Sequence, residues 1–228
     1  MHRLLADGGI YASLLNLSDN PQLHVRIPTT KWNSSASLQM LDLYRVNATG
    51  SIPKPVWNLT NIEVLHLDDN HLEGPIFDYF RFGKLTELYR GNNNFDGQLE
   101  FLSFNRIWTQ LEFLDFSSNF VTGPIPSNVS GMQNLQLLFL SSIHLNGTIP
   151  SWIFSLPSLE WLDLSHNHFS GNIQEFKSTT LDGVSLKQNQ LQGLIPKSLL
   201  NHHHLYYLLL SHNNLSGQIA STICNLTY

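Results

Sequence analysis

The phrase LDLSHNHFSGNI occupies residues 162–173, and close variants of it return elsewhere in the chain. LHLDDNHLEGPI starts at Leu65, LDFSSNFVTGPIP at Leu114 and LLLSHNNLSGQI at Leu208. The glycine of the phrase recurs at intervals of 22 to 26 residues, at Gly50, Gly74, Gly97, Gly123, Gly147, Gly171, Gly193 and Gly217. One structural unit is therefore copied along the chain, with a period in the range of leucine-rich repeats.

Each unit begins with leucines two residues apart, such as Leu162 and Leu164. This alternation places both leucines on one face of a short strand. An Ile-Pro pair after the glycine, as at Ile149 and Pro150, buries an apolar side chain and then fixes an extended return. The sequence predicts a leucine-rich-repeat solenoid of the plant extracellular type, with a parallel β-sheet on its concave face. Short 3-10 or helical turns and irregular extended segments are expected on its convex face.

An asparagine marks the corner where the chain leaves most of the strands. A buried amide at this position can satisfy backbone groups of the neighbouring repeat. Six asparagines are therefore predicted to be structural: Asn70, Asn93, Asn119, Asn167, Asn189 and Asn213. Val46 and Ile143 occupy two other corners, and these turns are expected to lose ladder bonds. Arg90 replaces the second strand leucine of its repeat. Either its guanidinium enters the core or the strand bends outward, and local distortion is expected.

The repeats also predict the domain organisation. Residues 1–14 carry no repeat signal, whereas residues 15–228 are interpreted as about nine leucine-rich repeats, of which the first two are degenerate. The opening residues lack an apolar stretch long enough for a signal peptide. No segment approaches the roughly 18 to 20 apolar residues of a membrane span. We therefore expect no direct membrane insertion by this part of the protein.

Composition and motif content argue against several functions. The chain has 12 Lys and Arg against 17 Asp and Glu, and no run of basic residues, so it lacks the basic stripe of a nucleic-acid-binding surface. No phosphate-binding glycine loop, kinase catalytic loop or zinc-protease motif occurs. We expect no enzymatic activity, no cofactor and no metal. The single cysteine, Cys224, is interpreted as an unpaired, partly buried thiol.

Two groups of residues contain chemically suggestive side chains. The histidines at 202–204 are consecutive, but His202 falls at a convex leucine position and neighbours on one segment point apart, which argues against a metal site. Asp163, Ser165 and His166 include the residue types of a catalytic triad. An equivalent Asp and Ser recur in another repeat, so the repeat pattern explains them better than catalysis does.

Asn-x-Ser/Thr sequons are about twice as frequent as chance predicts, which favours a secreted, N-glycosylated protein. Seven are predicted acceptors: Asn33, Asn47, Asn58, Asn128, Asn146, Asn214 and Asn225. An eighth, Asn16, lies on an expected concave strand, so we predict poor occupancy there. The alternative is that asparagine-rich repeats generate such triplets without being modified.

Counting back from each corner identifies the strand residues that face solvent on the concave side, which in a solenoid form one continuous surface. The predicted ligand-binding residues on this surface are Tyr89, Phe113, Asp115, Phe139, Trp161, Asp163 and Tyr207. Exposed apolar patches mark interaction sites, so Phe139 and Trp161 are expected to anchor a ligand and the aspartates to select a basic group. Alternatively, the aromatic side chains pack against one another across strands, which stabilises a sheet by about 0.2 to 1 kcal/mol per pair.

Longer phrases carry a resemblance to a known family. They include PKPVWNLTNIEVLHLDDNHLEGPI from Pro53, LNGTIPSWIFSLPSL from Leu145 and NLSGQIASTICNL from Asn214. From about Leu15 onward the chain resembles plant leucine-rich-repeat receptor-like proteins, most closely the tomato Cf class of disease-resistance receptors. The resemblance implies the extracellular side of a plasma-membrane receptor. It also implies recognition of a pathogen-derived protein or peptide in plant defence, and signalling through receptor-kinase co-receptors. We expect this chain to be a partial ectodomain, either a fragment of a longer receptor or a truncated paralogue.

Two other functions use the same repeats. A secreted inhibitor of a microbial cell-wall enzyme would use the concave face without membrane signalling. The ectodomain of a receptor kinase would precede a catalytic domain. The residues of this chain do not separate these alternatives from the receptor-like protein.

Overall fold

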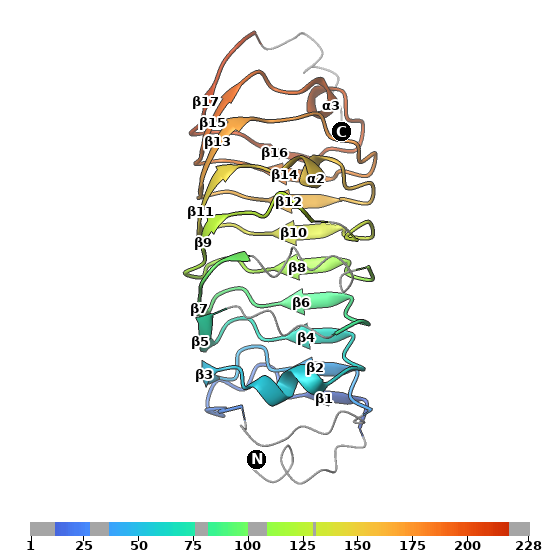
Figure 1. The fold of residues 1–228 in the computed structure, drawn as a ribbon, viewed down its shortest axis with the longest axis vertical. Coiled ribbons are helices and arrows are strands. Elements are labelled where there is room, and N and C mark those ends of the chain that lie inside the picture. Colours follow the sequence, from blue (N-terminus) through green and yellow to red (C-terminus); the bar gives the residue numbers. More distant parts are fainter. Residues whose placement is uncertain (1–11, 28–36, 76–81, 100–108, 130, 219–228) are drawn as a thin grey trace.

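The structure is a computed structural model, which describes residues 12–27, 37–75, 82–99, 109–129 and 131–218. Its short strands lie one above another along the long axis of the molecule, from β1 near the N-terminus to β16 near the C-terminus (Figure 1). Each repeat contributes one rung of this stack. The molecule is therefore a solenoid, as the spacing of the glycines predicts.

Within the described residues, the main sheet is parallel and has nine strands in the order β1-β2-β4-β6-β8-β10-β12-β14-β16. Each strand is three residues long, and its central residue, a leucine in all but one, pairs with the central residue of the next strand. The predicted parallel sheet is confirmed. Its strands are β1 (Leu14–Asn16), β2 (Met40–Asp42), β4 (Val64–His66), β6 (Glu87–Tyr89), β8 (Phe113–Asp115), β10 (Leu137–Phe139), β12 (Trp161–Asp163), β14 (Gly183–Ser185) and β16 (Tyr207–Leu209).

The extended segments after the corners form two further parallel sheets, where the sequence predicted irregular structure. They pair because identical corners bring successive segments into register, and glycines such as Gly171, with φ 79°, make the bend that each segment needs. The first sheet contains β3 (Thr49–Ser51), β5 (His71–Pro75) and β7 (Asn94–Asp96). The second, here called the lateral sheet, contains β9 (Thr122–Pro124), β11 (His144–Thr148), β13 (His168–Asn172), β15 (Gln190–Gly193) and β17 (Asn214–Leu215).

In the part of the chain that the structure describes, short helical turns follow the prolines of three repeats, as predicted for the convex side. They are the 3-10 helix η1 (Lys54–Asn58) and the helices α2 (Ser151–Phe154) and α3 (Lys197–Leu200). The residue before each turn is Pro53, Pro150 or Pro196, each in an extended conformation. Proline fixes φ near the value that a first helical turn requires and has no N–H to leave unpaired.

The core is a continuous apolar column between the main sheet and the convex segments. The central strand leucines, such as Leu88, Leu114 and Leu162, are fully buried. Convex residues such as Met132 and Leu135 close the column from the other side. Because each repeat packs only on its neighbours, burial is continuous along the stack and decreases in the terminal strands, where Leu15 and Leu208 are only partly buried.

The corner asparagines hold neighbouring repeats together through their amides. Asn167 Oδ1 accepts a hydrogen bond from the Leu145 N–H at 3.0 Å, and its Nδ2 donates to the Leu140 carbonyl at 2.7 Å. Nδ2 also donates to the Leu164 and Ser165 carbonyls of its own turn. One buried amide thus bonds to four backbone groups, two in its own turn and two in the preceding repeat.

Within the described residues, the N–H groups of Val46 and Ile143 donate to no backbone carbonyl of the next repeat, unlike that of Asn167, so the expected loss of ladder bonds is limited to the corner itself. The Ser142 N–H donates to the Ser165 carbonyl and the His144 N–H donates to the Val121 carbonyl, so the backbone ladder continues on both sides of Ile143. What Ile143 cannot supply is the side-chain amide that other corners offer to the preceding repeat.

Arg90 points into the core, and the strand beside it stays regular. Its side chain is among the largest fully buried ones, with the guanidinium 4.2 Å from the ring centre of Phe95 and 5.4 Å from that of Phe116. Contact with aromatic faces stabilises a buried cation, although burial lowers the pKa of Arg90 to about 9. Strand β6 pairs in register with both β4 and β8, so the expected local distortion was wrong.

Candidate ligand-binding face

The concave face is formed by the first and third residues of each strand in the main sheet. In β4, β6, β8, β10 and β12 these residues are half-buried while the central leucine is buried. Because the strands pair without offsets, equivalent side chains stand one strand spacing apart along the stack. The face is thus a regular array of side chains on a rigid support.

A row of neighbouring rings, some stacked and some tilted, runs along the N-terminal half of this face and is here called the aromatic ladder. Successive ring centres are 5.5 Å apart from Tyr44 to His66, 4.2 Å from His66 to Tyr89, 4.0 Å from Tyr89 to Phe113 and 5.6 Å from Phe113 to Phe139. Three predicted ligand-binding residues, Tyr89, Phe113 and Phe139, therefore lie in one run. The rings contact one another, as the purely structural interpretation requires, yet they keep part of their surface open to solvent.

Trp161 and Tyr207 form a second aromatic pair, with ring centres 5.7 Å apart across strand β14. The ring of Trp161 lies over Gly183, where an added Cβ would come within 2.6 Å of it. Tyr207 is 49% exposed. Leu137 pairs with Phe113 on one side and Trp161 on the other, and so it joins the pair to the aromatic ladder.

The two predicted aspartates lie on the same face with one oxygen already engaged. Asp115 Oδ1 accepts a hydrogen bond from the Ser117 N–H at 2.7 Å, and Asp163 Oδ1 accepts one from the Ser165 N–H at 2.9 Å. Asp115 also packs over Gly91, where a Cβ would lie 2.8 Å from Oδ2. Burial raises the pKa of Asp115, although the hydrogen bonds from Ser117 oppose the shift.

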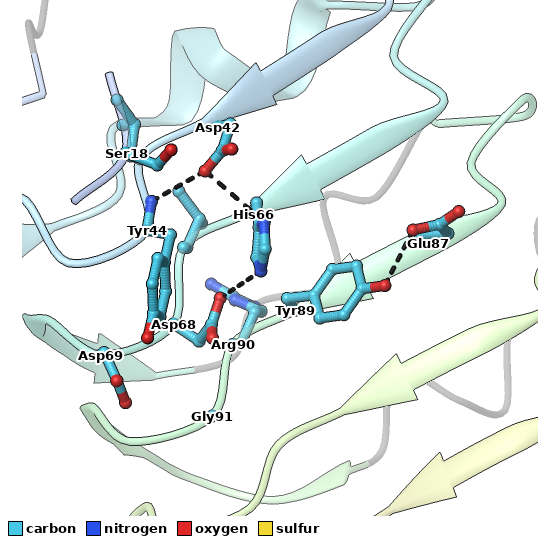
Figure 2. Close-up of polar contacts among 12 residues, drawn as sticks. Ser18, Asp42, Tyr44, His66, Asp68, Asp69, Glu87, Tyr89, Arg90 and Gly91 are labelled. Carbon is cyan, nitrogen blue, oxygen red and sulfur yellow. Dashed lines mark hydrogen bonds and ion pairs between the residues drawn. The ribbon is translucent and has the colours of Figure 1, made fainter. Parts of the chain in front are cut away.

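A histidine between two carboxylates is the feature that the sequence analysis missed. His66 Nδ1 is 3.5 Å from Asp42 Oδ1, and His66 Nε2 is 2.8 Å from Asp68 Oδ1 (Figure 2). Asp42 is held in place because it also accepts hydrogen bonds from Asn16 Nδ2 at 2.8 Å and from the Tyr44 N–H at 3.0 Å. The signal was available, since His66 occupies the strand position that holds an aspartate in β2, β8 and β12.

The surroundings of His66 decide its charge. Burial disfavours the imidazolium, but the hydrogen bond to Asp68 and the negative charges of Asp68, Asp42 and Glu87 outweigh it and raise the pKa of His66. Next to it, the Tyr89 hydroxyl donates to Glu87 at 2.9 Å. Burial and this bond raise the pKa of Tyr89, so Tyr89 stays a neutral donor at physiological pH.

The sequons lie mostly away from the concave face. Asn146 in β11 and Asn214 in β17 are exposed on the lateral sheet, and Asn128 is exposed beyond β9. Asn47 is half-buried just before β3. Asn33, Asn225 and the side chain of Asn58 lie outside the described residues, as does Cys224.

The histidines at 202–204 lie after helix α3 on the convex side. Burial lowers the pKa of His202, and its ring is 6.5 Å from that of His204. In the part of the chain that the structure describes, no three His, Cys, Asp or Glu side chains gather in a metal-binding arrangement. Nor does this part contain a helix with the length and apolarity to cross a membrane.

Comparisons with known proteins agree with the architecture. A family model described as a leucine-rich repeat matches residues 109–169, and a second leucine-rich-repeat model matches residues 204–226. The Arabidopsis receptor kinase HAESA, solved with the peptide hormone IDA and the co-receptor SERK1, superposes with a TM-score of 0.73 at 32% identity, over 85% of this chain and 33% of that chain. A plant ice-binding protein gives a TM-score of 0.80 at 27% identity, over 93% of this chain and 68% of that one.

A receptor-like protein of tomato (Solanum lycopersicum), the Cf-9 homolog, is 64% identical over 202 residues, which are 78% of this chain and 24% of the relative. The chain thus spans about a quarter of the length of that relative. The fold and these matches define the class as an extracellular leucine-rich-repeat ectodomain of a plant receptor. Within that class, the chain belongs to the receptor-like proteins of the Cf type.

Proposed function

We propose that this chain is a ligand-recognition segment of a cell-surface immune receptor-like protein, and that its concave face binds a pathogen-derived protein or peptide. The observation that carries the proposal is the combination of half-exposed rings and carboxylates along one regular face. Rings supply large contact areas with little loss of conformational freedom, and the carboxylates beside them select basic groups. Binding, and not catalysis, is the activity that such a face supports.

Two features support a protein or peptide ligand over a small molecule. The face is an open array of three-residue strands, and an open array suits an extended partner better than a small molecule, which prefers an enclosed pocket. The aromatic ladder and the pair Trp161 and Tyr207 are joined through Leu137, so anchors recur over five successive strands of the sheet. A partner that spans several repeats would contact all of them.

Receptor-kinase co-receptors are the proposed signalling partners. The related ectodomain of HAESA was solved together with the co-receptor SERK1. By analogy, the intact receptor would use its own co-receptor to pass the signal across the plasma membrane. The analogy rests on a shared fold, and it places no contact on a particular residue of this chain.

The proposed ligand-binding face is tested by removing two anchors in the intact receptor. The variant Phe139→Ser with Trp161→Ser removes apolar contact from both aromatic groups while leaving the backbone ladder in place. We expect normal surface expression and a loss of at least tenfold in the response to the pathogen elicitor, the scale of about 1.4 kcal/mol or more of binding free energy for hot-spot residues.

A matched control replaces two exposed apolar residues outside the concave face. Phe120→Ser with Leu194→Ser alters side chains that are 57% and 67% exposed, and it should leave the response unchanged. If the Phe139 and Trp161 variant reaches the surface and responds like the wild type, the rings serve only to stabilise the sheet.

A further inference from the structure

Charge is distributed unevenly between the two sides of the solenoid. The strands of the main sheet, with the residue before and the three residues after each, carry many acids: Asp19, Asp42, Glu63, Asp68, Asp69, Glu87, Glu112, Asp115, Glu160, Asp163 and Asp182. Within these same described segments the solvent-facing lysine and arginine residues are Lys187 and Arg45, and the histidines are His66, His166 and His212. Exposed lysines occur instead on convex segments, at Lys54, Lys84, Lys177 and Lys197.

This asymmetry identifies the partner chemistry that the concave face fits. Acids repeated along one face produce a negative potential that a single ion pair would not, and such a potential attracts partners of opposite charge. The net charge of −5 understates the effect because the convex lysines offset it in the total. The rings of the aromatic ladder lie among these acids and can contact the stems or faces of cationic side chains.

His66 lies where this negative potential meets the aromatic ladder. Its ring stacks between Tyr44 and Tyr89, and its two nitrogens face Asp42 and Asp68 (Figure 2). The other titratable groups around it are Asp69 of its own turn, Glu87 on β6 and Asp115 on β8. The guanidinium of Arg90 lies on the core side of the sheet, between Phe95 and Phe116.

We propose that the ligand presents a basic segment to the acidic concave face, and that a proton on His66 opposes its binding. The inference rests on the proposed function and deepens it by naming the charge of the ligand and the control of its affinity. When protonated, His66 neutralises one unit of charge and holds both Asp42 and Asp68. When neutral, it leaves the face with one more unit of negative charge for the ligand.

The direction of the pH dependence follows from linkage between the proton and the ligand. Both are cations that favour the same carboxylates, so each weakens the binding of the other. In the free protein the surrounding acids raise the pKa of His66. Below that pKa the imidazole is protonated, and above it the imidazole is neutral. Affinity for a basic ligand rises as the pH rises through that pKa.

The test uses a fluorescein-labelled octalysine peptide as the probe and the full chain at about 50 mM salt, where the Debye length is still longer than 10 Å. The wild type should bind octalysine about tenfold more tightly at pH 7.5 than at pH 5.0, the effect of one nearby unit charge. His66→Gln should lose most of this pH dependence. His144→Gln, which alters an exposed histidine of the lateral sheet, should keep the wild-type dependence.

A second comparison tests whether octalysine binds the concave face or is attracted only by the net charge of the protein. Glu112→Gln with Glu160→Gln removes two charges beside the main sheet, whereas Glu73→Gln with Asp96→Asn removes two exposed charges on β5 and β7. The first pair should weaken octalysine binding severalfold and the second should leave it unchanged. Equal weakening by both pairs would show that the peptide follows net charge, and the acidic face would then be no docking surface.

A measurement on the wild type tests the role of His66 even if the His66→Gln variant does not fold. The pKa of His66, followed by NMR through its imidazole ring protons, should fall when octalysine is added to the wild type. An unchanged pKa, or a His66→Gln variant that keeps the full wild-type pH dependence, overturns the proposal. If these results hold while the Phe139 and Trp161 variant still responds to elicitor, the basic docking surface stands and the rings are not the anchors of the elicitor.

Discussion

At the scale of single residues, the corner asparagines do more for stability than their polar side chains suggest. Asn70 accepts hydrogen bonds from the Val46 and Ala48 N–H groups and donates to the Leu43 carbonyl, all in the preceding repeat. It is 6% exposed, so water cannot replace these bonds. A buried backbone group that loses its partner keeps the whole desolvation cost, which makes each corner sensitive to substitution.

Asn167→Ala should therefore lower the free energy of unfolding by about 1 to 3 kcal/mol, because it leaves the Leu145 N–H and the Leu140 carbonyl without their amide partner. Ser170→Ala is the matched change in the same repeat, since its hydroxyl makes only a 3.4 Å bond to the Gly147 carbonyl. Thermal denaturation of the two variants measures the difference. Similar shifts in Tm would contradict the structural role of the corner amide.

At the scale of elements, the fold could be predicted from the sequence because its signals are local and repeated. The leucines of each strand, the corner asparagine and the Ile-Pro turn act within one repeat. The lateral sheet was not predicted, because its pairing depends on the position of the neighbouring repeat. Arg90 was left undecided for a similar reason: the rings of Phe95 and Phe116 that receive it come from other segments.

The candidate site was only partly predictable from the sequence, because its side-chain contacts also depend on neighbouring repeats. Counting along the strands identified Phe113 and Phe139 as facing solvent, and the structure brings them into contact. Counting gave no indication that Trp161 pairs with Tyr207 across a glycine, and although His66 occupies the strand position of Asp42, counting did not place Asp68 on its other side. These arrangements depend on side-chain rotamers and on three strands at once.

Gly183 of strand β14 determines where the ring of Trp161 lies on the concave face. Gly183→Ala should displace the ring of Trp161, because the new Cβ would lie 2.6 Å from it, and should lower the free energy of unfolding by about 1 to 3 kcal/mol through overpacking. The fluorine NMR signal of labelled Trp161 should shift with it. Gly83→Ala is the control, since a Cβ there meets nothing within 4 Å. A Trp161 signal that stays in place would show that the ring does not rest on Gly183.

At the scale of the whole molecule, the sequons and the proposed ligand-binding face occupy different sides. Asn146 and Asn214 are on the lateral sheet, whereas the rings are on the main sheet. Attached glycans would cover the lateral side and leave the concave face accessible. Asn16 is the exception, since it lies on β1 of the main sheet.

Glycopeptide mapping from a secretory host should find Asn128 and Asn146 occupied and Asn16 largely bare. The Nδ2 atom of Asn16, to which a glycan would be attached, already donates to Asp42, whereas Asn128 and Asn146 are exposed. Occupancy of Asn16 equal to that of Asn146 would contradict the assignment of β1 to the concave sheet. Bare asparagines at all three sites would remove the sequons as support for secretion.

Every rung of the main sheet has the same three-residue length and pairs without offset, while the interval between successive glycines varies from 22 to 26 residues. Differences in repeat length are therefore taken up away from the paired strands. A duplication or deletion of one whole rung would give each remaining rung a neighbour of the same geometry. Unequal recombination between such repeats could lengthen, shorten or reshuffle the recognition surface across generations without unfolding the protein that carries it.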